Sequence, residues 1–356
     1  MEPEIKFELS EIQNIEKVIR DQVVKFQNLR NLVKDLEFIP VESIGTYSSV
    51  TYKSIDGGKM GISFYPFELD YIVISDSYGN ELIKFLVPKG ADLSPIDFSY
   101  MNDFHEIKIL LKLLGLNSIT ESSGILQNSK IAMEIAEYAS IFTKLIKEKN
   151  EPLIIMKDGL LRTKSLKREN IEKLLTILKD FKRRKLIGVS KSSKVLNLIS
   201  SALFIENKIP DNATGYIEIP WEIEKIAYKQ MTKERLYQAF GKLYVAKLSK
   251  LSKLLVTVEI PYDLKNNEEI YSRRDINEIF GHLIKDSMGS YPVLGYPQTI
   301  MRAHEKAVRK GFTASIWSEK IIDKILENLG SQRLKKLIIE GNFLREYVKK
   351  GVLGGT

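Results

Sequence analysis

The sequence predicts an α/β fold in which one mixed sheet is flanked by helices. Residues 47–87 are rich in β-branched and aromatic residues and are divided by turn signals, as expected for neighbouring strands. The short apolar run 153–156 follows a helical stretch, which is typical of a strand buried on both faces of a sheet. Helical and strand-like segments then alternate without a flexible linker, so we expect one α/β domain with helical insertions.

A long amphipathic helix is predicted over residues 5–37. Its apolar side chains recur at helical spacing, namely Ile12, Ile15, Ile19, Val23, Phe26 and Leu29. Such a stripe is buried either on the helix's own domain or against a partner, and both alternatives remain open. We expect residues 1–40 to form a helical arm for a dimer mate or partner, residues 41–350 the main domain, and residues 351–356 a short tail.

The first strands should form an antiparallel meander of three or four strands. Turn signals fall at Asp56-Gly57 and at residues 78–80. Asp-Gly between apolar runs is a strong hairpin signal because both residues tolerate positive φ. The sequence therefore predicts a hairpin at Asp56.

The remaining elements follow the same periodicity. We expect a helix at 129–148 capped by Ser129, and a central strand at 153–156 beside the first strand. Residues 195–235 should be helices and loops. The other predicted elements are a helix at 167–184, strands at 185–191, 239–250 and 254–261, a helix at 273–288, and helical structure from about 297 to 350.

Composition limits the function. The 356 residues hold no cysteine, which excludes disulfides and thiolate zinc sites and leaves carboxylates and three histidines as metal ligands. Oxygen ligands favour Mg²⁺ or Mn²⁺. The net charge of +8 is concentrated in basic clusters of the second half, which suits phosphate binding as well as a solvated surface. No apolar run is long enough for a membrane span and no signal peptide is evident, so we expect a cytoplasmic protein without membrane contact.

Candidate metal ligands occur in a particular order along the chain. The two Asp-Gly pairs place Asp56 and Asp158 at apolar strands, and the intervening helix carries Glu134 and Glu137. This order of strand, helix and strand carboxylates is used by ribonuclease-H-like nucleases to hold two metal ions. Glu134 lies closer to the apolar stripe of the helix, whereas the separation of Glu137 from Asp158 fits better, so Glu137 is favoured and Glu134 is the alternative.

The C-terminal segment "GYPQTIMRAHEKA" adds a tyrosine and a histidine. Pro297 suits the first position of a helix, which puts Tyr296 before the helix and His304 within it. Ile300, His304 and Val308 share one helix face, so the imidazole is predicted to point toward the interior.

Four short segments together resemble the NurA nucleases. They are "IDGG" at 55–58, "KDGLL" at 157–161, "GVSK" at 188–191 and the pattern "GYPxxIxxAH" at 295–304. NurA nucleases are archaeal and bacterial enzymes that process DNA ends in double-strand break repair together with the hexameric HerA translocase. The resemblance covers Tyr47 to about Phe312 and departs from the family pattern "DGS" at Gly159-Leu160.

The resemblance implies a ribonuclease-H-like fold, a homodimer, and Mn²⁺-dependent cleavage of single- and double-stranded DNA. It implies that Asp56, Glu137 and Asp158 hold one or two Mn²⁺ or Mg²⁺ ions. His304 would complete a metal shell or hold the attacking water, and Tyr296 would donate a hydrogen bond to a phosphate.

Basic residues near these segments are candidates for DNA contact. Lys191 follows the predicted strand 185–191 and is suited to stabilising charge on the phosphate during cleavage. Lys194, Arg302 and Arg309 would line the DNA path. Two alternatives remain: a non-catalytic DNA-binding scaffold, and a ribonuclease-H-like enzyme acting on RNA or DNA junctions.

Overall fold

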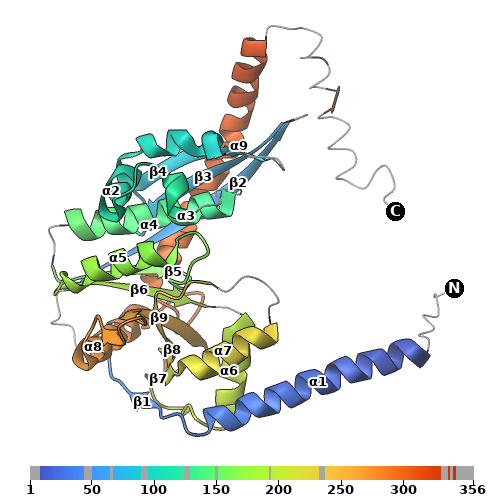
Figure 1. Cartoon of the computed structure of the whole chain (residues 1–356), viewed down its shortest axis with the longest axis vertical. Coiled ribbons are helices and arrows are strands. Elements are labelled where there is room, and N and C mark those ends of the chain that lie inside the picture. Colours follow the sequence, from blue (N-terminus) through green and yellow to red (C-terminus); the bar gives the residue numbers. More distant parts are fainter. Residues whose placement is uncertain are drawn as a thin grey trace.

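The described residues form a mixed ten-stranded sheet with helices on both faces (Figure 1). The computed structural model describes residues 9–43, 50–64, 67–89, 95–123, 129–148, 151–191, 194–231 and 237–329, together with residues 336, 340 and 341. The strands are β1 (Ile39–Pro40), β2 (Thr51–Phe64), β3 (Phe67–Asp76), β4 (Glu81–Pro88), β5 (Leu153–Asp158), β6 (Arg184–Ser190), β7 (Gly215–Ile219), β8 (Gly241–Lys247), β9 (Leu255–Asp263) and β10 (Glu268–Glu269). The helices are α1 (Leu9–Val33), the 3₁₀ helix η1 (Pro95–Asp103), α2 (His105–Leu114), α3 (Ile119–Ser123), α4 (Ser129–Lys147), α5 (Arg168–Lys179), α6 (Lys194–Ile205), α7 (Trp221–Met231), α8 (Arg273–Ser287) and α9 (Gln298–Leu329).

The strand order confirms the predicted fold class. Across the sheet the strands follow the order β1-β7-β8-β9-β6-β5-β2-β3-β4, and β10 pairs with β9. Strands β2, β3 and β4 form an antiparallel meander, and β5 and β6 continue the sheet in parallel on the side of β2. A meander extended by parallel strands next to its first strand is the ribonuclease-H-like arrangement. The long helix predicted over residues 5–37 is present as α1, Leu9–Val33.

Strand β5 lies in the middle of the sheet and is buried on both faces, as predicted. Leu153 and Ile155 belong to one apolar cluster, whereas Ile154 and Met156 belong to the cluster on the opposite face. The alternation follows from the period of two residues in a strand. The same alternation decides on which face each polar residue at the end of β5 lies.

Different helices cover the two faces. Helices α2, α4 and α5 pack on one face of β2 to β6, through side chains such as Ile107, Ile135 and Leu174. Helix α8 and the first turns of α9 pack on the opposite face, through residues such as Phe280 and Ile300. Helices α1, α6 and α7 pack together over β7 and β8 in a third cluster.

The predicted hairpin at Asp56 is wrong. Strand β2 continues through Asp56 and Gly57 to Phe64 without a break, and Asp56 is paired with Ser75 of β3. The meander therefore has three strands rather than four. Local turn preference is overruled here because the glycines after Asp56 serve the packing of two helices, as described below.

Other boundaries also differ from the prediction. Strand β7 was not predicted, because its five residues lie between two helices in a stretch without clear alternation. Helix α5 ends at Lys179, earlier than predicted, since β6 begins at Arg184. Residues 1–8 and 342–356 lie outside the described residues, and with them the start of the predicted arm, the end of the last helix and the tail 351–356. Among the described helices, none is both long and apolar enough to cross a membrane.

Candidate active site

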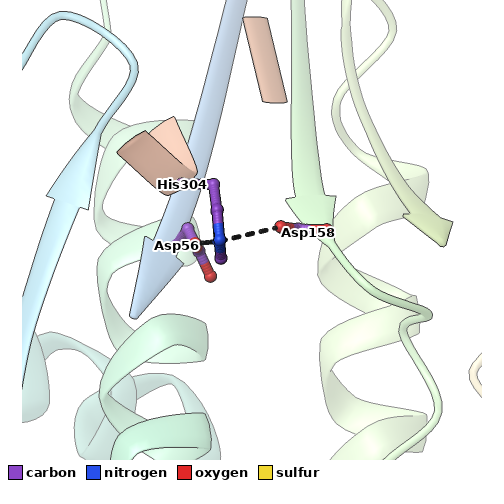
Figure 2. A group of neighbouring side chains, drawn as sticks. All are labelled: Asp56, Asp158 and His304. Carbon is purple, nitrogen blue, oxygen red and sulfur yellow. Dashed lines mark hydrogen bonds and ion pairs between the residues drawn. The ribbon is translucent and has the colours of Figure 1, made fainter. Parts of the chain in front are cut away.

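Asp56 and Asp158 lie side by side on the α9 face of the sheet. Strands β2 and β5 are parallel, and their register pairs Ile55 with Lys157. Ile55 belongs to the cluster under α4, so the next residue on each strand, Asp56 and Asp158, points to the opposite face. Figure 2 shows the two carboxylates extending toward each other from neighbouring strands.

His304 of α9 completes a three-residue cluster with these carboxylates (Figure 2). Its Nδ1 atom lies 2.9 Å from Oδ2 of Asp56 and 3.6 Å from Oδ2 of Asp158. One ligand atom from each residue lies within 4.8 Å of the others. As predicted, the imidazole points toward the sheet, on the same helix face as the buried Ile300, although the His304 side chain remains 50% exposed.

Tyr296 is a buried residue that contacts the cluster through Asp158. Its ring is buried in the cluster under α9, and its hydroxyl donates a hydrogen bond to Oδ1 of Asp158 over 3.0 Å. The sequence predicts a phosphate contact for this hydroxyl, but the structure gives it a carboxylate as partner. Tyr296 therefore orients Asp158.

The electrostatics of the cluster suit a divalent cation. Burial and the neighbouring Asp56 carboxylate raise the pKa of Asp158 above its usual value. The hydrogen bond to Asp56 raises the pKa of His304. Two carboxylates that repel each other and an imidazole nitrogen form a donor set that fits Mn²⁺ or Mg²⁺. The residues present therefore fit the metal that the resemblance implies.

Glu137 lies near Asp56, which it approaches from the α4 side, and both line the same cavity. It projects from α4 and is 4% exposed. Its Oε1 atom accepts a hydrogen bond of 3.0 Å from the Gly57 N–H, and its Oε2 atom lies 3.0 Å from the Lys157 ammonium. Burial raises the pKa of Glu137 to about 7, although Lys157 acts in the opposite direction. The structure does not bring Glu137 into the cluster of Asp56, Asp158 and His304.

Glu134, the alternative helix carboxylate, lies one turn earlier on α4. It accepts a hydrogen bond from the hydroxyl of Ser165 and lines the same cavity as Glu137. It is also absent from the cluster of Asp56, Asp158 and His304. Of the predicted metal ligands, Asp56, Asp158 and His304 lie together, whereas Glu137 and its alternative Glu134 lie beside this cluster and their role as ligands stays a prediction.

Gly57 permits the close approach of Glu137 to strand β2. A Cβ atom at this position would lie 2.7 Å from Oε1 of Glu137 and 2.6 Å from Cγ of Met133. Both distances are shorter than real carbon contacts allow. The glycine after Asp56 is therefore explained by helix packing and not by a turn.

Two cavities meet at the cluster. One has a volume of about 700 Å³ and the other about 800 Å³, and both are lined by Asp158, Lys191 and His304. The first lies along α9 and the second opens beside α4, which their further lining residues show: Tyr291, Val293, Tyr296, Met301, Arg302 and Arg309 for the first, and Asp56, Glu134, Glu137, Lys157, Lys164 and Tyr237 for the second. Together the two cavities make the carboxylates accessible from two sides.

The predicted basic residues have different places. Lys191 follows β6 and is exposed, with Nζ 5.8 Å from the centre of the Tyr296 ring. Arg302 and Arg309 line the first cavity, and Arg309 forms an ion pair with Glu305. Lys194 begins α6, but its side chain lies outside the described part of the structure.

Lys157 is a residue of the site that the sequence analysis missed. It is 7% exposed and directly precedes Asp158. Burial alone would lower the pKa of its ammonium, but Glu137 raises that pKa above the usual value. The available signal was a charged residue at the end of the buried run "LIIMKDG", where lysine requires an anionic partner.

The fold and the cluster define a ribonuclease-H-like protein with a candidate divalent-metal centre. The NurA domain matches residues 54–309, which include all three residues of the cluster. The chain therefore belongs to the NurA family.

Solved structures with a similar course of the chain include NurA proteins. The NurA nuclease from Sulfolobus solfataricus is 14% identical, with a TM-score of 0.41, and the match covers 89% of this chain and 98% of that one. A NurA structure with manganese is 10% identical, with a TM-score of 0.43 and coverage of 83% and 95%. An Argonaute from Marinitoga piezophila in complex with guide RNA and target DNA is 14% identical, with a TM-score of 0.27 and coverage of 73% and 30%. Among proteins with curated functions, none matches this chain.

Proposed function

We propose that the protein is a divalent-metal-dependent deoxyribonuclease that hydrolyses phosphodiester bonds. The observation that carries the proposal is the convergence of Asp56, Asp158 and His304 at the junction of two open cavities. Membership of the NurA family supports it, since that family includes a protein described as a nuclease. The substrates would be single- and double-stranded DNA, cut as exonuclease and single-strand endonuclease.

Asp56, Asp158 and His304 would hold the Mn²⁺ or Mg²⁺ ion. When bound, such a cation lowers the pKa of a water molecule and neutralises charge on the scissile phosphate. The protein prepares this site through its own contacts. Tyr296 fixes the Asp158 carboxylate, and Asp56 fixes the ring of His304.

Basic side chains would hold the substrate. The exposed Lys191 ammonium lies where the two cavities meet, which suits it to stabilise negative charge that develops on the phosphate. Arg302 and Arg309 line the cavity beside it and would contact phosphates further along the strand. Phosphate contacts of this kind position DNA without reading its sequence.

The proposal extends to the cellular role. The protein would process DNA ends in double-strand break repair in the cytoplasm, as a homodimer that works with a HerA-type hexameric ATPase. We assign residues 1–40 to an arm that contacts the dimer mate or partner, and residues 41–350 to the nuclease domain. The apolar residues exposed on α1 support an intermolecular contact there.

The test uses labelled single-stranded DNA, double-stranded DNA and RNA, each with Mn²⁺ or with a chelator. We expect metal-dependent loss of DNA alone. The Asp158→Asn variant should cleave at least about 10²-fold more slowly, because it removes an anionic ligand while keeping the shape. Asp103→Asn, at a carboxylate 86% exposed and remote from the cluster, is the matched control. Bound but intact DNA would favour the scaffold alternative, and cleavage of RNA the other alternative.

A further inference from the structure

The buried lysine beside the metal cluster has a defined place in the site. The Lys157 ammonium lies 3.0 Å from Oε2 of Glu137 and 3.3 Å from the carbonyl oxygen of Asp158. Both charged side chains are buried, with exposed fractions of 7% and 4%. A buried ion pair of this kind persists only when each charge has its partner, because an uncompensated buried charge is strongly destabilising.

This ion pair adjoins the metal cluster, because Glu137 Oε1 and Asp56 Oδ1 accept the same Gly57 N–H and both side chains line one cavity. Lys157 is paired in register with Ile55, whose side chain lies under α4, and Glu137 projects from α4 itself. Asp56 and Asp158, one residue further along each strand, point to the α9 face, where His304 joins them. The carboxylates therefore project from the α9 side and the ion pair from the α4 side, and the two groups meet at the end of β5, where they line the same cavity.

Both oxygens of Glu137 are already engaged on the α4 face. Oε1 accepts the Gly57 N–H and Oε2 faces Lys157. A metal ion bound to Glu137 would have to displace the ammonium from a buried position. Lys157 neutralises this carboxylate, and the two carboxylates that remain, Asp56 and Asp158, balance the charge of a single divalent cation.

We infer that this chain holds one divalent cation per site and that the Lys157 ammonium takes the place of a second one beside Glu137. The inference rests on the proposed function and makes it more specific. Lys157 is a positioning residue: it holds Glu137, which in turn holds the backbone of Gly57 next to Asp56. The presence of lysine at the end of β5 thus decides the number of metal ions.

The number of bound ions tests the inference directly. The wild-type protein is titrated with Mn²⁺ to saturation, and bound ions are counted by equilibrium dialysis and by electron paramagnetic resonance. We expect one ion per chain with the spectrum of an isolated Mn²⁺. Two ions per chain with exchange coupling, as expected for ions about 4 Å apart, would overturn the inference.

Variants separate the roles of the two faces. Lys157→Met keeps the length of the side chain and frees Glu137, so we expect a second ion to bind, with Glu134 as its neighbouring carboxylate. Lys59→Met is the matched control, since Lys59 is also paired with a buried carboxylate, Asp70, at 2.9 Å, and should leave one ion. Should Lys157→Met fail to fold, Glu137→Gln decides. The Gln amide oxygen still accepts the Gly57 N–H, so the affinity for the single ion should change less than about threefold, whereas removal of an anionic metal ligand would cost about 10-fold or more.

The outcomes distinguish this inference from the proposed function. Two ions in the wild type, together with metal-dependent DNA cleavage, would overturn the inference and leave the nuclease in place. DNA cleavage that persists with chelator would overturn the metal-dependent nuclease. A wild-type protein that binds no Mn²⁺ at all would overturn both.

Discussion

Individual side chains hold the candidate metal ligands in place before any cation arrives. Oδ1 of Asp158 accepts a hydrogen bond from the Tyr296 hydroxyl, and Oδ2 of Asp158 faces His304. Oδ1 of Asp56 accepts a hydrogen bond from the N–H of its neighbour Gly57, and Oδ2 of Asp56 contacts the His304 ring. Such outer contacts fix ligand orientation, and their loss typically costs 10- to 100-fold in metal affinity or activity.

Tyr296→Phe tests this positioning. The variant keeps the buried ring and removes only the hydrogen bond to Asp158, so we expect Mn²⁺ affinity to fall about 10- to 100-fold with little change in melting temperature. Titration calorimetry and thermal unfolding give the two values. Tyr216→Phe is the control, because Tyr216 lies in the same apolar cluster and donates to Asn277 instead. Wild-type affinity in Tyr296→Phe would contradict the positioning role.

The resemblance of short motifs to the NurA nucleases was needed to predict three of the residues that meet at the site, because residue types and spacing alone predict a turn at Asp56. Asp56, Asp158 and His304 were identified from short motifs in the sequence, and the structure brings them together. The ion pair between Glu137 and Lys157 was not predictable from the sequence, because this pair forms only if Lys157 points to the α4 face of β5. A shift by one residue in the register between β2 and β5 would exchange Lys157 and Asp158.

At the scale of elements, the segment Asp56-Gly57-Gly58 brings two helices onto one strand. Gly57 accommodates Glu137 of α4, and Gly58 accommodates the backbone of α9. Local preference alone predicts a turn at Asp-Gly, and nothing in the sequence shows which distant segments pack there. Strand β5 was predictable, in contrast, because burial on both faces requires a run of apolar residues.

Gly58→Ala should displace α9 and thereby His304. A Cβ atom at residue 58 would lie 2.3 Å from the carbonyl oxygen of Ala307, which is backbone and cannot rotate away. We expect a loss of about 1–3 kcal/mol in the free energy of unfolding and a clear loss of Mn²⁺ affinity. Gly61→Ala on the same strand is the control, since its nearest neighbour is the flexible end of Lys89 at 3.1 Å. Equal effects of both variants would refute the explanation.

Asp70 should make the stability depend on pH. Burial alone would raise the pKa of its carboxyl, but hydrogen bonds from Ser129 at the start of α4 and from Lys59 outweigh burial and lower it. A lowered pKa in the folded state stabilises the protein above the pKa of the unfolded chain, near 3.9, and this contribution disappears as the pH falls through the folded-state pKa.

Asp70→Asn should therefore lower the free energy of unfolding by about 2 kcal/mol at pH 7. The difference from wild type should shrink as the pH falls below about 4. Urea unfolding between neutral and acidic pH measures both. Asp103→Asn, at an exposed carboxylate, should follow the wild type throughout. A difference that stays constant with pH would show that Asp70 acts through its shape and not through its charge.

At the scale of the whole molecule, the NurA domain leaves the N-terminal helix outside its bounds. The domain begins at residue 54, whereas α1 ends at Val33. Figure 1 shows α1 extending from the body of the molecule near α6 and α7. The apolar period of this helix was predictable, but not how its stripe divides. Leu29 and Val33 are buried against α6 and α7, whereas Ile15 and Ile19 are 49% and 57% exposed.

This division predicts that the first half of α1 contacts a second copy of the chain. Ile15→Glu combined with Ile19→Glu places charges in the exposed half of the stripe, and burying them against another chain would be costly. Light scattering should show the double variant as a monomer where the wild type is a dimer. Its melting temperature measured as a monomer should stay high, because Leu29 and Val33 still pack on the domain. Gln13→Glu combined with Asn14→Glu adds the same charge to exposed positions of the same helix outside that stripe and should remain dimeric. If the Ile15→Glu/Ile19→Glu variant remains a dimer, the subunit contact lies elsewhere. In either case this variant should cleave short oligonucleotides faster than Asp158→Asn does.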